Sequence, residues 1–544
     1  MTYSIGIDYG TGSGRVFLVQ TKTGKIVSQY IKPYTHGTID QELFGEKLPH
    51  GFSLQNANDY LEVLEEGIPH VLKEAEINSN DVLGIGIDFT ASTVIFVDKD
   101  MNPIHNKIGF EENPHAYVKL WKHHGAEEEA NLLFNTAIKK KKRWLGNYGY
   151  NVSSEWMIPK IMEVMNKAPE VMDETFAIME AGDWIVNKLT NQNIRSNCGI
   201  GFKAFWEAEN GFHYDLFDEI DKNLSKVIRD KVDTTIINIG DSAGHLSSEI
   251  ASKLGLSTNT QVSPFIIDAH SSLLGIGAEK ERQMTMVMGT STCHLMLNKK
   301  QKRIPGISGS VKGAIIPDLY AYEAGQSAVG DLFEYAVKQA PKSYIDEAES
   351  RNISIHHLFE EKAAMAKPGE SGLIALDWHN GNRSVLSDSS LRGSIFGLTL
   401  HTKPEEIYRA YLEATAFGAK MIMQQYEDWG LHVEDVFACS GIPKRNKLLM
   451  DIYANVLNKK IVVIDSEYTP AIGSAVLGAV VGGAYETIQE ATQNMKEPVL
   501  YEIEPDTEKV ERYEVLFKAY KELHDIHGYK KARIMRSISK LYTE

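Results

Sequence analysis

Short apolar runs alternate with glycine-rich polar turns at the N-terminus of the chain. Residues 5–9 and 15–19 are two such runs, and a second turn at 22–25 leads into the apolar pair Ile26-Val27. Runs of this length between turn residues predict antiparallel strands. We therefore expect the chain to begin with a three-stranded meander.

Helical and strand patterns alternate through the rest of the first half. Residues 58–77 show the spacing of a helix, and residues 82–89 form an apolar run typical of a buried strand. Residues 114–238 are expected to be mostly helical. The next apolar run, 262–267, ends at Asp268 and is followed by small residues.

The second half begins as the first one does. Residues 284–297 again form two apolar runs around a Gly-Thr-Ser-Thr turn. A long helix is expected over about 402–430, because capping residues and two acids stand at its start. A strand over 436–439 and a helix from about Asn446 follow. The last helix, predicted over about 506–526, has one apolar face.

Strands and helices that alternate in both halves imply an α/β protein. At 544 residues the chain exceeds the size at which one hydrophobic core keeps growing, so at least two domains are expected. The charged stretch 279–282 separates the two repeats of the pattern. We place the boundary after Ala278, which gives domains of 1–278 and 279–544.

The composition excludes several classes of protein. With 43% apolar and 24% charged residues the chain is an ordinary globular protein, and its formal charge of −16 argues against a general binder of nucleic acid or of anionic membranes. Three cysteines without a CxxC pair argue against a structural zinc site and fit a reducing compartment. The longest small-apolar stretch, 471–484, is too short to span a bilayer, and no signal-peptide pattern precedes the first strand. We expect a cytoplasmic protein.

Both predicted hairpins carry turns that suit a phosphate group. Glycines let the backbone approach an anion, and turn amides and hydroxyls donate hydrogen bonds to phosphate oxygens. Asp8, in the first hairpin, is well placed to hold the metal ion that accompanies a nucleoside triphosphate. Each hairpin taken alone fits an ordinary tight turn as well as a phosphate-binding one, since Gly, Ser and Thr are common turn residues. Two of them in one chain favour two related domains that face one nucleotide.

Asp268 is the candidate general base. An acid at the end of an apolar run, followed by small residues, is where an α/β fold exposes a catalytic group. A carboxylate there can accept the proton of an attacking hydroxyl, a step that typically contributes about 10²- to 10⁴-fold in rate. Alone, Asp268 would more often be a helix cap or an ion-pair partner, but the two phosphate hairpins reverse that weighting.

Two other motifs carry less weight. Residues 240–244 match GxSxG, the nucleophile elbow of α/β-hydrolases, but two residues and a separate cap intervene before the next predicted helix. A hydrolase is therefore a minor alternative. The basic run 139–143 is interpreted as a solvated face, as most such runs are.

A series of longer motifs runs in order along nearly the whole chain, to about residue 485. They are DYGTGSGR (8–15), DFTA (88–91), SSEWM (153–157), EAGDW (180–184), GFKA (201–204), GTSTCH (289–294), YEAGQS (322–327), DWHNGNRS (377–384) and GIPKRN (441–446). Together they resemble the FGGY family of carbohydrate kinases, and within it the members that phosphorylate L-ribulose. One departure is Ser440, where many members have the first glycine of a Gly-Gly pair.

The resemblance implies a fold and an activity. The fold would be two actin-like (ribonuclease H-like) α/β domains with the catalytic cleft between them, the first carrying sugar-binding insertions and the second the nucleotide-binding loops. ATP and Mg²⁺ would bind in the cleft, and the γ-phosphoryl group would pass to the terminal hydroxyl of a ketopentose, with L-ribulose from L-arabinose catabolism as the first candidate. The expected partners are the sugar and ATP, without nucleic acid or membrane. The oligomeric state stays open between a monomer and a homodimer.

The family's site residues carry over to motif positions of this chain. Asp268 corresponds to the general base, and Asp8 to the acid on the Mg²⁺ side. The other assignments are Thr11, Ser13 and Arg15 for the β- and γ-phosphates; Gly289, Thr290 and Ser291 for the second phosphate loop; Gly441 and Asn446 for the adenosine; and Ala91, Lys203, Asp268 and Glu323 for the sugar, with Gln326 as a further candidate.

Two alternatives stay open at this point. D-Ribulose, D- or L-xylulose and ribitol are told from L-ribulose by a few hydrogen bonds, and one unmatched buried polar group costs about 1 to 3 kcal/mol. The other alternative is an actin-like ATP-binding scaffold without catalysis. Such a scaffold would not need Lys203, Glu323 and Asp268 to converge on a sugar-sized site.

Overall fold

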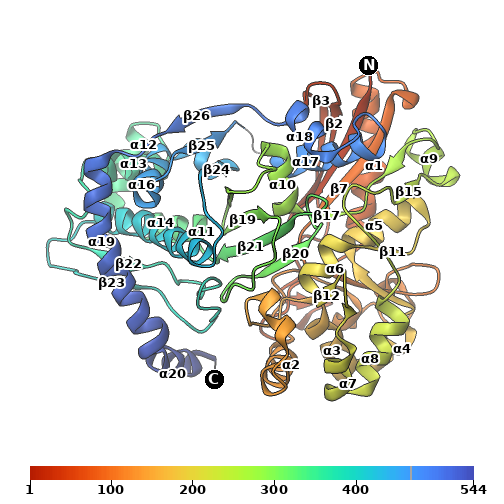
Figure 1. The fold of residues 1–544 in the computed structure, drawn as a ribbon, viewed down its shortest axis with the longest axis horizontal. Coiled ribbons are helices and arrows are strands. Elements are labelled where there is room, and N and C mark those ends of the chain that lie inside the picture. The colour runs from red at the N-terminus through yellow and green to blue at the C-terminus, as the bar shows by residue number, and fades with distance from the viewer. Residues whose placement is uncertain (466–467, 544) are drawn as a thin grey trace.

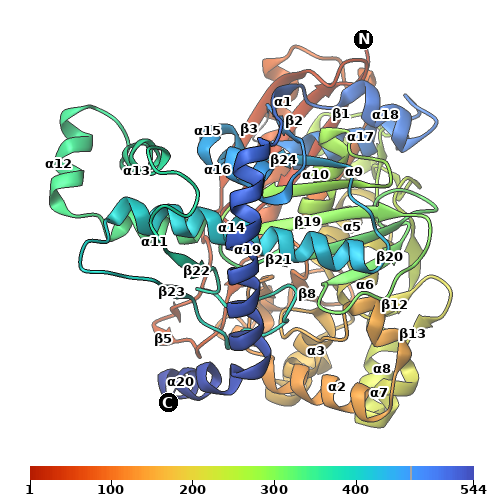
Figure 2. The same cartoon turned by 60° about the vertical axis from the view of Figure 1, so that its left-hand side comes forward.

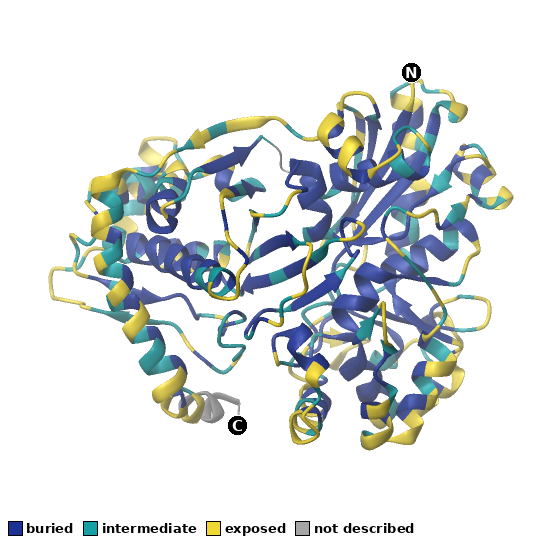
Figure 3. Ribbon diagram, viewed as in Figure 1, coloured by how far each residue is buried: buried dark blue, intermediate teal, exposed yellow. Residues whose placement is uncertain are grey.

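The computed structural model describes residues 1–465 and 468–543. Figure 1 shows two halves, with the N-terminal part of the chain on the right and most of the C-terminal part on the left. Within the described residues, each half contains a seven-stranded sheet. In Figure 3 the strands and the helices that lie on them are mostly buried, while exposed residues gather in loops and on the outer faces of peripheral helices.

The first sheet grows from the expected meander. Strands β1, β2 and β3 are antiparallel neighbours, β7 pairs in parallel with β1, and β16 and β17 both pair in parallel with β7. The strands are β1 (Tyr3–Tyr9), β2 (Ser13–Gln20), β3 (Ile26–Pro33), β7 (Val82–Phe89), β15 (Gly244–His245), β16 (Gln261–Val262) and β17 (Ile266–Ile267). The apolar run 262–267 thus forms two short strands, because Pro264 between them has no N–H to pair.

The second sheet repeats this core. Strands β18, β19 and β21 form an antiparallel meander, and β24 pairs in parallel with β18 as β7 does with β1. The order is β20 (Gly309–Lys312), β21 (Tyr320–Gln326), β19 (Thr292–Asn298), β18 (Gln283–Met288), β24 (Asp435–Cys439), β25 (Ile461–Ile464) and β26 (Val499–Ile503). The repeat of the sequence pattern is therefore a repeat of the fold.

Helices close the faces of both sheets. Helix α1 (Asn58–Glu74) packs on β2 and β3, where its Val63 lies against Gly14. In the second half α14 (Pro404–Asp428), α16 (Lys447–Leu457) and α19 (Thr507–Asp525) pack on one another. Figure 2 shows α19 crossing α14 on the outside of this half, and α12 (Lys342–Ser350) and α13 (Ile355–Ala364) projecting beyond it. No described helix is long and apolar enough to cross a membrane.

One helix of the second half belongs spatially to the first. α17 (Thr469–Val481) packs on β1 and β7 and against α10 (Asp268–Ile276). Its backbone lies so close to the sheet that a Cβ at Gly6 or Gly86 would collide with a carbonyl oxygen of α17, that of Ala471 or Ser474. The boundary after Ala278 stays a prediction, and α17 ties the two halves together across it.

The expected mostly helical segment 114–238 forms a subdomain with a core of its own. Helices α2 (Glu127–Lys139) and α3 (Met157–Lys167) lie in this core. The apolar residues of α5 (Ala181–Thr190) join the core of the first sheet, and α6 (Asn197–Lys203) contributes to both. Trp144 and Trp156 are buried in this core, with their rings against Phe205. These aromatic side chains are core residues rather than an exposed sugar platform.

Candidate functional site

Three carboxylates stand at or just beyond the ends of three adjacent parallel strands. Asp8 in β1 pairs with Asp88 in β7, and Ile266-Ile267 of β17 pairs with Asp88-Phe89, so that Asp268 follows directly. Because paired residues of neighbouring strands share a face, Asp8 and Asp88 lie on the face that α17 covers. The carboxyl ends of parallel strands are where α/β proteins place their sites.

Asp88 is the most deeply buried of the three. Its Oδ2 accepts a hydrogen bond from Ser474 Oγ of α17 at 2.6 Å, while Oδ1 has no partner. Burial, followed by the charge of Asp8, raises the pKa of Asp88 well above its ordinary value, and Asp268 adds to the shift. An unpartnered carboxylate oxygen among like charges is a favourable place for a cation.

Asp268 is the first residue of α10 and is partly exposed. Its Oδ1 accepts the Ala269 N–H at 2.7 Å. Burial raises its pKa to about 7, an effect that the Ala269 amide opposes and the charges of Asp8 and Glu323 reinforce. A carboxyl group with this pKa can take up and release a proton near neutral pH, as a general base requires.

The first phosphate hairpin is preformed. The Gly10 N–H donates to the Ser13 carbonyl oxygen at 3.0 Å, and Arg15 Nη1 pairs with Asp8 Oδ2 at 2.6 Å. Thr11 is anchored from outside the hairpin, because Trp121 Nε1 donates to its hydroxyl at 3.1 Å. A Cβ at Gly12 would meet nothing within 4 Å, so the turn faces open space.

The second hairpin has a similar turn that is one residue shorter. The Gly289 N–H donates to the carbonyl oxygen of Ser291, two positions on, at 2.8 Å, whereas Gly10 donates to Ser13, three positions on. Its backbone is tied to the start of α11 (Gly330–Lys338), since the Val329 N–H donates to the Thr290 carbonyl oxygen at 2.8 Å. Burial raises the pKa of Cys293, which lies just after the loop, and the charges of Glu323 and Asp268 reinforce the shift.

Lys203 and Glu323 form an ion pair between the two halves. Lys203, the last residue of α6, places Nζ 3.0 and 3.2 Å from the two carboxylate oxygens of Glu323 in β21. His270 Nε2 lies 3.0 Å from Glu323 Oε2. Burial alone would raise the pKa of Glu323, but Lys203 and His270 outweigh it and hold that pKa well below its usual range. Ala91, partly buried, lies in the turn directly after β7.

The structure does not bring Gln326 to this cluster. Its amide donates to Asp377 Oδ2 at 3.0 Å and to the Thr415 carbonyl oxygen at 2.9 Å, and the side chain is buried in the second half. Its assignment to the sugar stays a prediction that no contact supports.

The two residues that the resemblance assigns to the adenosine follow β24, which pairs with β18 of the second phosphate hairpin. Gly441 begins α15 (Gly441–Arg445), and Asn446 caps α16 by accepting the Leu449 N–H at 2.8 Å. Ser440, between β24 and α15, has φ 82° and ψ −175°. This backbone region is essentially restricted to glycine, so a serine there holds the backbone under strain.

Some residues of the site were not assigned a role from the sequence. Asp88 was recognised in a motif but not as part of the carboxylate cluster, although an acid at the end of a buried strand was an available signal. Arg383 Nη2 and Glu155 Oε1 pair at 3.2 Å across the two halves. No local pattern could have revealed this pair, since its partners lie 228 positions apart.

The carboxylate cluster suits a Mg²⁺ ion that is bound partly through substrate. Among the described residues no group of three or more His, Cys, Asp or Glu side chains could form a metal cage. Magnesium usually uses one or two carboxylates together with phosphate oxygens and water. Asp8 and the unpartnered Oδ1 of Asp88 fit that mode of binding.

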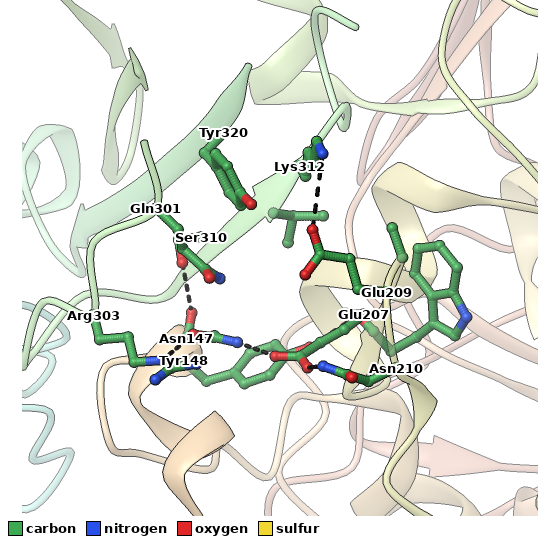
Figure 4. A pocket seen from close by; sticks show the side chains of 13 residues that line it. Asn147, Tyr148, Glu207, Glu209, Asn210, Gln301, Arg303, Ser310, Lys312 and Tyr320 are labelled. Atoms are coloured by element: carbon green, nitrogen blue, oxygen red, sulfur yellow. Dashed lines mark hydrogen bonds and ion pairs between the residues drawn. The ribbon is translucent and has the colours of Figure 1, made fainter. Parts of the chain in front are cut away.

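Two surface pockets lie elsewhere, where the helical subdomain meets the second half. Figure 4 shows one of about 70 Å³, in which Arg303 Nε donates to Asn147 Oδ1 at 2.9 Å and Lys312 pairs with Glu209 at 3.8 Å. The other, of about 360 Å³, is lined by Lys141, Lys142, Arg143 and Arg303. None of the predicted site residues lines either pocket. Ser242 of the GxSxG match lies on an exposed turn and bonds Gln261, so it is no buried elbow.

Comparison with known proteins identifies relatives along the whole chain. Residues 3–275 match the N-terminal domain, and residues 284–481 the C-terminal domain, of the FGGY family of carbohydrate kinases. Proteins named ribulokinase from Staphylococcus aureus strains Newman and MSSA476 are each 70% identical over 544 residues, which is 100% of this chain and of theirs.

Solved structures share the fold at low sequence identity. A ligand-bound xylulose kinase from Lactobacillus acidophilus superposes with a TM-score of 0.81 at 17% identity, covering 98% of this chain and 100% of its own. A gluconate kinase from the same organism gives 0.82 at 18% identity, covering 98% and 99%. Plasmodium falciparum glycerol kinase with ADP gives 0.76 at 18% identity, covering 96% and 98%. The expected two-domain actin-like α/β fold is thereby confirmed.

Proposed function

The chain belongs to the FGGY family of carbohydrate kinases, and we propose that it phosphorylates L-ribulose at its terminal hydroxyl, with ATP as the donor, to give L-ribulose 5-phosphate. The main support for a sugar-binding site is the Lys203–Glu323 ion pair, which joins the two halves beside Asp268. Full-length similarity to ribulokinases supports L-ribulose over other sugars. The reaction would belong to the breakdown of L-arabinose.

Asp268 acts as the general base of this reaction. Its pKa of about 7 lets it accept the proton of the terminal hydroxyl as the oxygen attacks the γ-phosphorus. The proton leaves the sugar oxygen, the new O–P bond forms, and the bond between the β–γ bridging oxygen and the γ-phosphorus breaks to release ADP. The Asp268 carboxylate is held in place at the start of α10, because the Ala269 N–H donates a hydrogen bond to its Oδ1.

The two hairpins bind the phosphates from opposite halves. Thr11, Ser13 and Arg15 face the β- and γ-phosphates from the first half, and residues 289–291 face them from the second. Arg15 is held in place by Asp8, which with Asp88 would also hold Mg²⁺. When bound, that ion neutralises charge on the phosphates. Gly441 and Asn446 would contact the adenosine.

Two charged side chains and one small side chain would recognise the sugar. Lys203 donates to sugar oxygens and Glu323 accepts from a hydroxyl, while the small side chain of Ala91 leaves room beside the end of β7. Because Lys203 and Glu323 come from different halves, a bound sugar would touch both domains. We infer that the two domains close on the substrates while α17 stays packed on the first sheet, which would keep water away from the γ-phosphate.

The test is an ADP-release assay with Mg-ATP that compares L-ribulose with D-ribulose, L- and D-xylulose, ribitol, glycerol and no sugar. Clear preference for L-ribulose, at least about tenfold in kcat/KM, is the expected result. Faster turnover of another pentulose or of ribitol would support the kinase activity but assign it a different preferred sugar. ATP turnover that does not depend on sugar, or none at all, would overturn the proposal in favour of an ATP-binding scaffold.

A further inference from the structure

A buried chain of hydrogen bonds lies behind the Lys203–Glu323 pair. His270, in the first turn of α10, contacts Glu323 with one ring nitrogen and Cys198 of α6 with the other. The distances are 3.0 Å from Nε2 to Glu323 Oε2 and 3.3 Å from Nδ1 to Cys198 Sγ. His270 and Cys198 are both 0% exposed, so neither side chain can reach a substrate directly.

Each hydrogen bond from Cys198 through His270 to Glu323 can have only one donor and one acceptor assignment. Glu323 is ionised, because Lys203 and His270 hold its pKa low, and an ionised carboxylate can only accept. His270 Nε2 must therefore carry the hydrogen. Burial lowers the pKa of His270, so the ring is neutral and Nδ1 is an acceptor. Burial raises the pKa of Cys198, whose S–H then donates to Nδ1.

Packing holds the imidazole in this orientation. The ring of Phe202 lies against it, with the centroids 4.5 Å apart and the planes at 52°. Phe202 is itself buried and lies against Gly309 of β20. His270 also stands two residues after Asp268, so one turn of α10 presents the proposed base and supports Glu323.

We propose that His270 is a positioning residue for sugar specificity: it fixes the Glu323 carboxylate so that one acceptor position remains for a sugar hydroxyl, and Cys198 fixes the His270 tautomer. Lys203 donates two bonds and His270 one, and an ionised carboxylate accepts about four. The remaining position requires a hydroxyl that can donate from one direction. The inference rests on the proposed role of Glu323 in binding the sugar.

The experiment compares matched variants of the full chain by steady-state kinetics, with sugar and ATP varied separately. His270→Met removes the donor to Glu323, whereas His270→Gln keeps an N–H near the position of Nε2. Cys198→Ala removes the donor to Nδ1, whereas Cys198→Ser keeps one. His213→Met is the control, since His213 is also buried and its Nε2 lies 3.7 Å from Glu207 in the helical subdomain.

The expected result is a rise in the sugar KM with the ATP KM unchanged. His270→Met should raise the KM of the preferred sugar about 10- to 100-fold, the usual effect of losing a hydrogen bond to a charged group. It should also reduce discrimination between that sugar and its nearest epimer by at least about tenfold. His270→Gln should restore most of both quantities. Cys198→Ala should show a smaller change in the same direction, about two- to tenfold, that Cys198→Ser lacks.

Other results would overturn the inference. A folded His270→Met variant with an unchanged sugar KM would refute it, as would equal losses in His270→Met and His270→Gln. A lower kcat with both KM values unchanged would also refute it, because KM does not depend on the fraction of enzyme that is correctly folded. Failure of the proposed function is distinguishable, because wild-type protein would then not turn over L-ribulose; the KM comparison is made with whichever sugar it does turn over.

Discussion

Replacing Ser440 with glycine should stabilise the second half of the protein. Ser440 links β24 to α15 with φ 82° and ψ −175°, a conformation that a residue with a Cβ adopts only under strain. Ser440→Gly removes that Cβ and leaves the backbone as it is.

The size of the effect follows from two opposing terms. A non-glycine residue in this region stores about 1 to 3 kcal/mol of strain. Glycine gives back about 0.4 to 1 kcal/mol, because it increases the freedom of the unfolded chain. The net gain is about 1 to 2 kcal/mol, which for a unit of 150 to 250 residues corresponds to a rise in Tm of about 2 to 8 °C.

Scanning calorimetry of Ser440→Gly and Ser440→Ala without ligands measures this gain. Ser440→Ala loses the hydroxyl but keeps the Cβ and the strain, so its Tm should be no higher than that of the wild type. A Ser440→Gly variant that is no more stable than Ser440→Ala would refute the reasoning. The KM for ATP should change less than about twofold in Ser440→Gly, because the strand-to-helix turn keeps its shape.

The remaining predictions concern the carboxylate cluster and the ion pair between the halves. Asp268→Asn should lower kcat at least about 100-fold while nucleotide affinity, measured by calorimetric titration, stays nearly intact. In the wild type, kcat/KM for the sugar should rise with pH through about 7, because Asp268 must lose its proton to act as a base. The same raised pKa means that the folded state holds this proton more tightly than the unfolded state, so wild-type stability should fall relative to Asp268→Asn as pH rises from about 4 to 7. Lys203→Met and Glu323→Gln should each raise the sugar KM and lower stability, and the double variant should lose less stability than the sum, since a buried charge without its partner costs about 3 to 5 kcal/mol.

Each of these has a result that would count against it. Normal turnover in Asp268→Asn would show that Asp268 is not the general base. An acidic limb of the pH profile near 4 would mean that Asp268 is not shifted or is not the base. Additive losses of stability in the Lys203–Glu323 cycle would mean that the pair is not coupled, despite the 3.0 Å between Nζ and Oε1.

Local patterns in the sequence were sufficient for many elements of the fold. Both phosphate hairpins form where the glycine-rich turns predicted them, and β7 runs over residues 82–89 as expected. These elements depend on turn residues and on short apolar runs, and both are visible within a few neighbouring residues of the sequence. The apolar run 262–267 forms two short strands rather than one, because Pro264 has no N–H for pairing.

The candidate site was predictable only in part. Asp8 and Asp268 could be named because each stands at a recognisable place in a strand or turn pattern. The roles of Lys203 and Glu323 came from family resemblance, and their direct contact came from the structure. Gln326 stays a further candidate for the sugar, and in the structure its amide bonds Asp377 inside the second half.

The sequence by itself determined the repeated hairpins, the α/β class and the family, because these depend on short-range patterns and on motifs in a fixed order. Only the tertiary structure decided that α17 of the second half packs on the first sheet and that Glu155 meets Arg383. It also decided that His270 stands between Cys198 and Glu323. Contacts between residues far apart in the chain arise from the packing of whole elements, and no local run of residues encodes which distant side chain will be met.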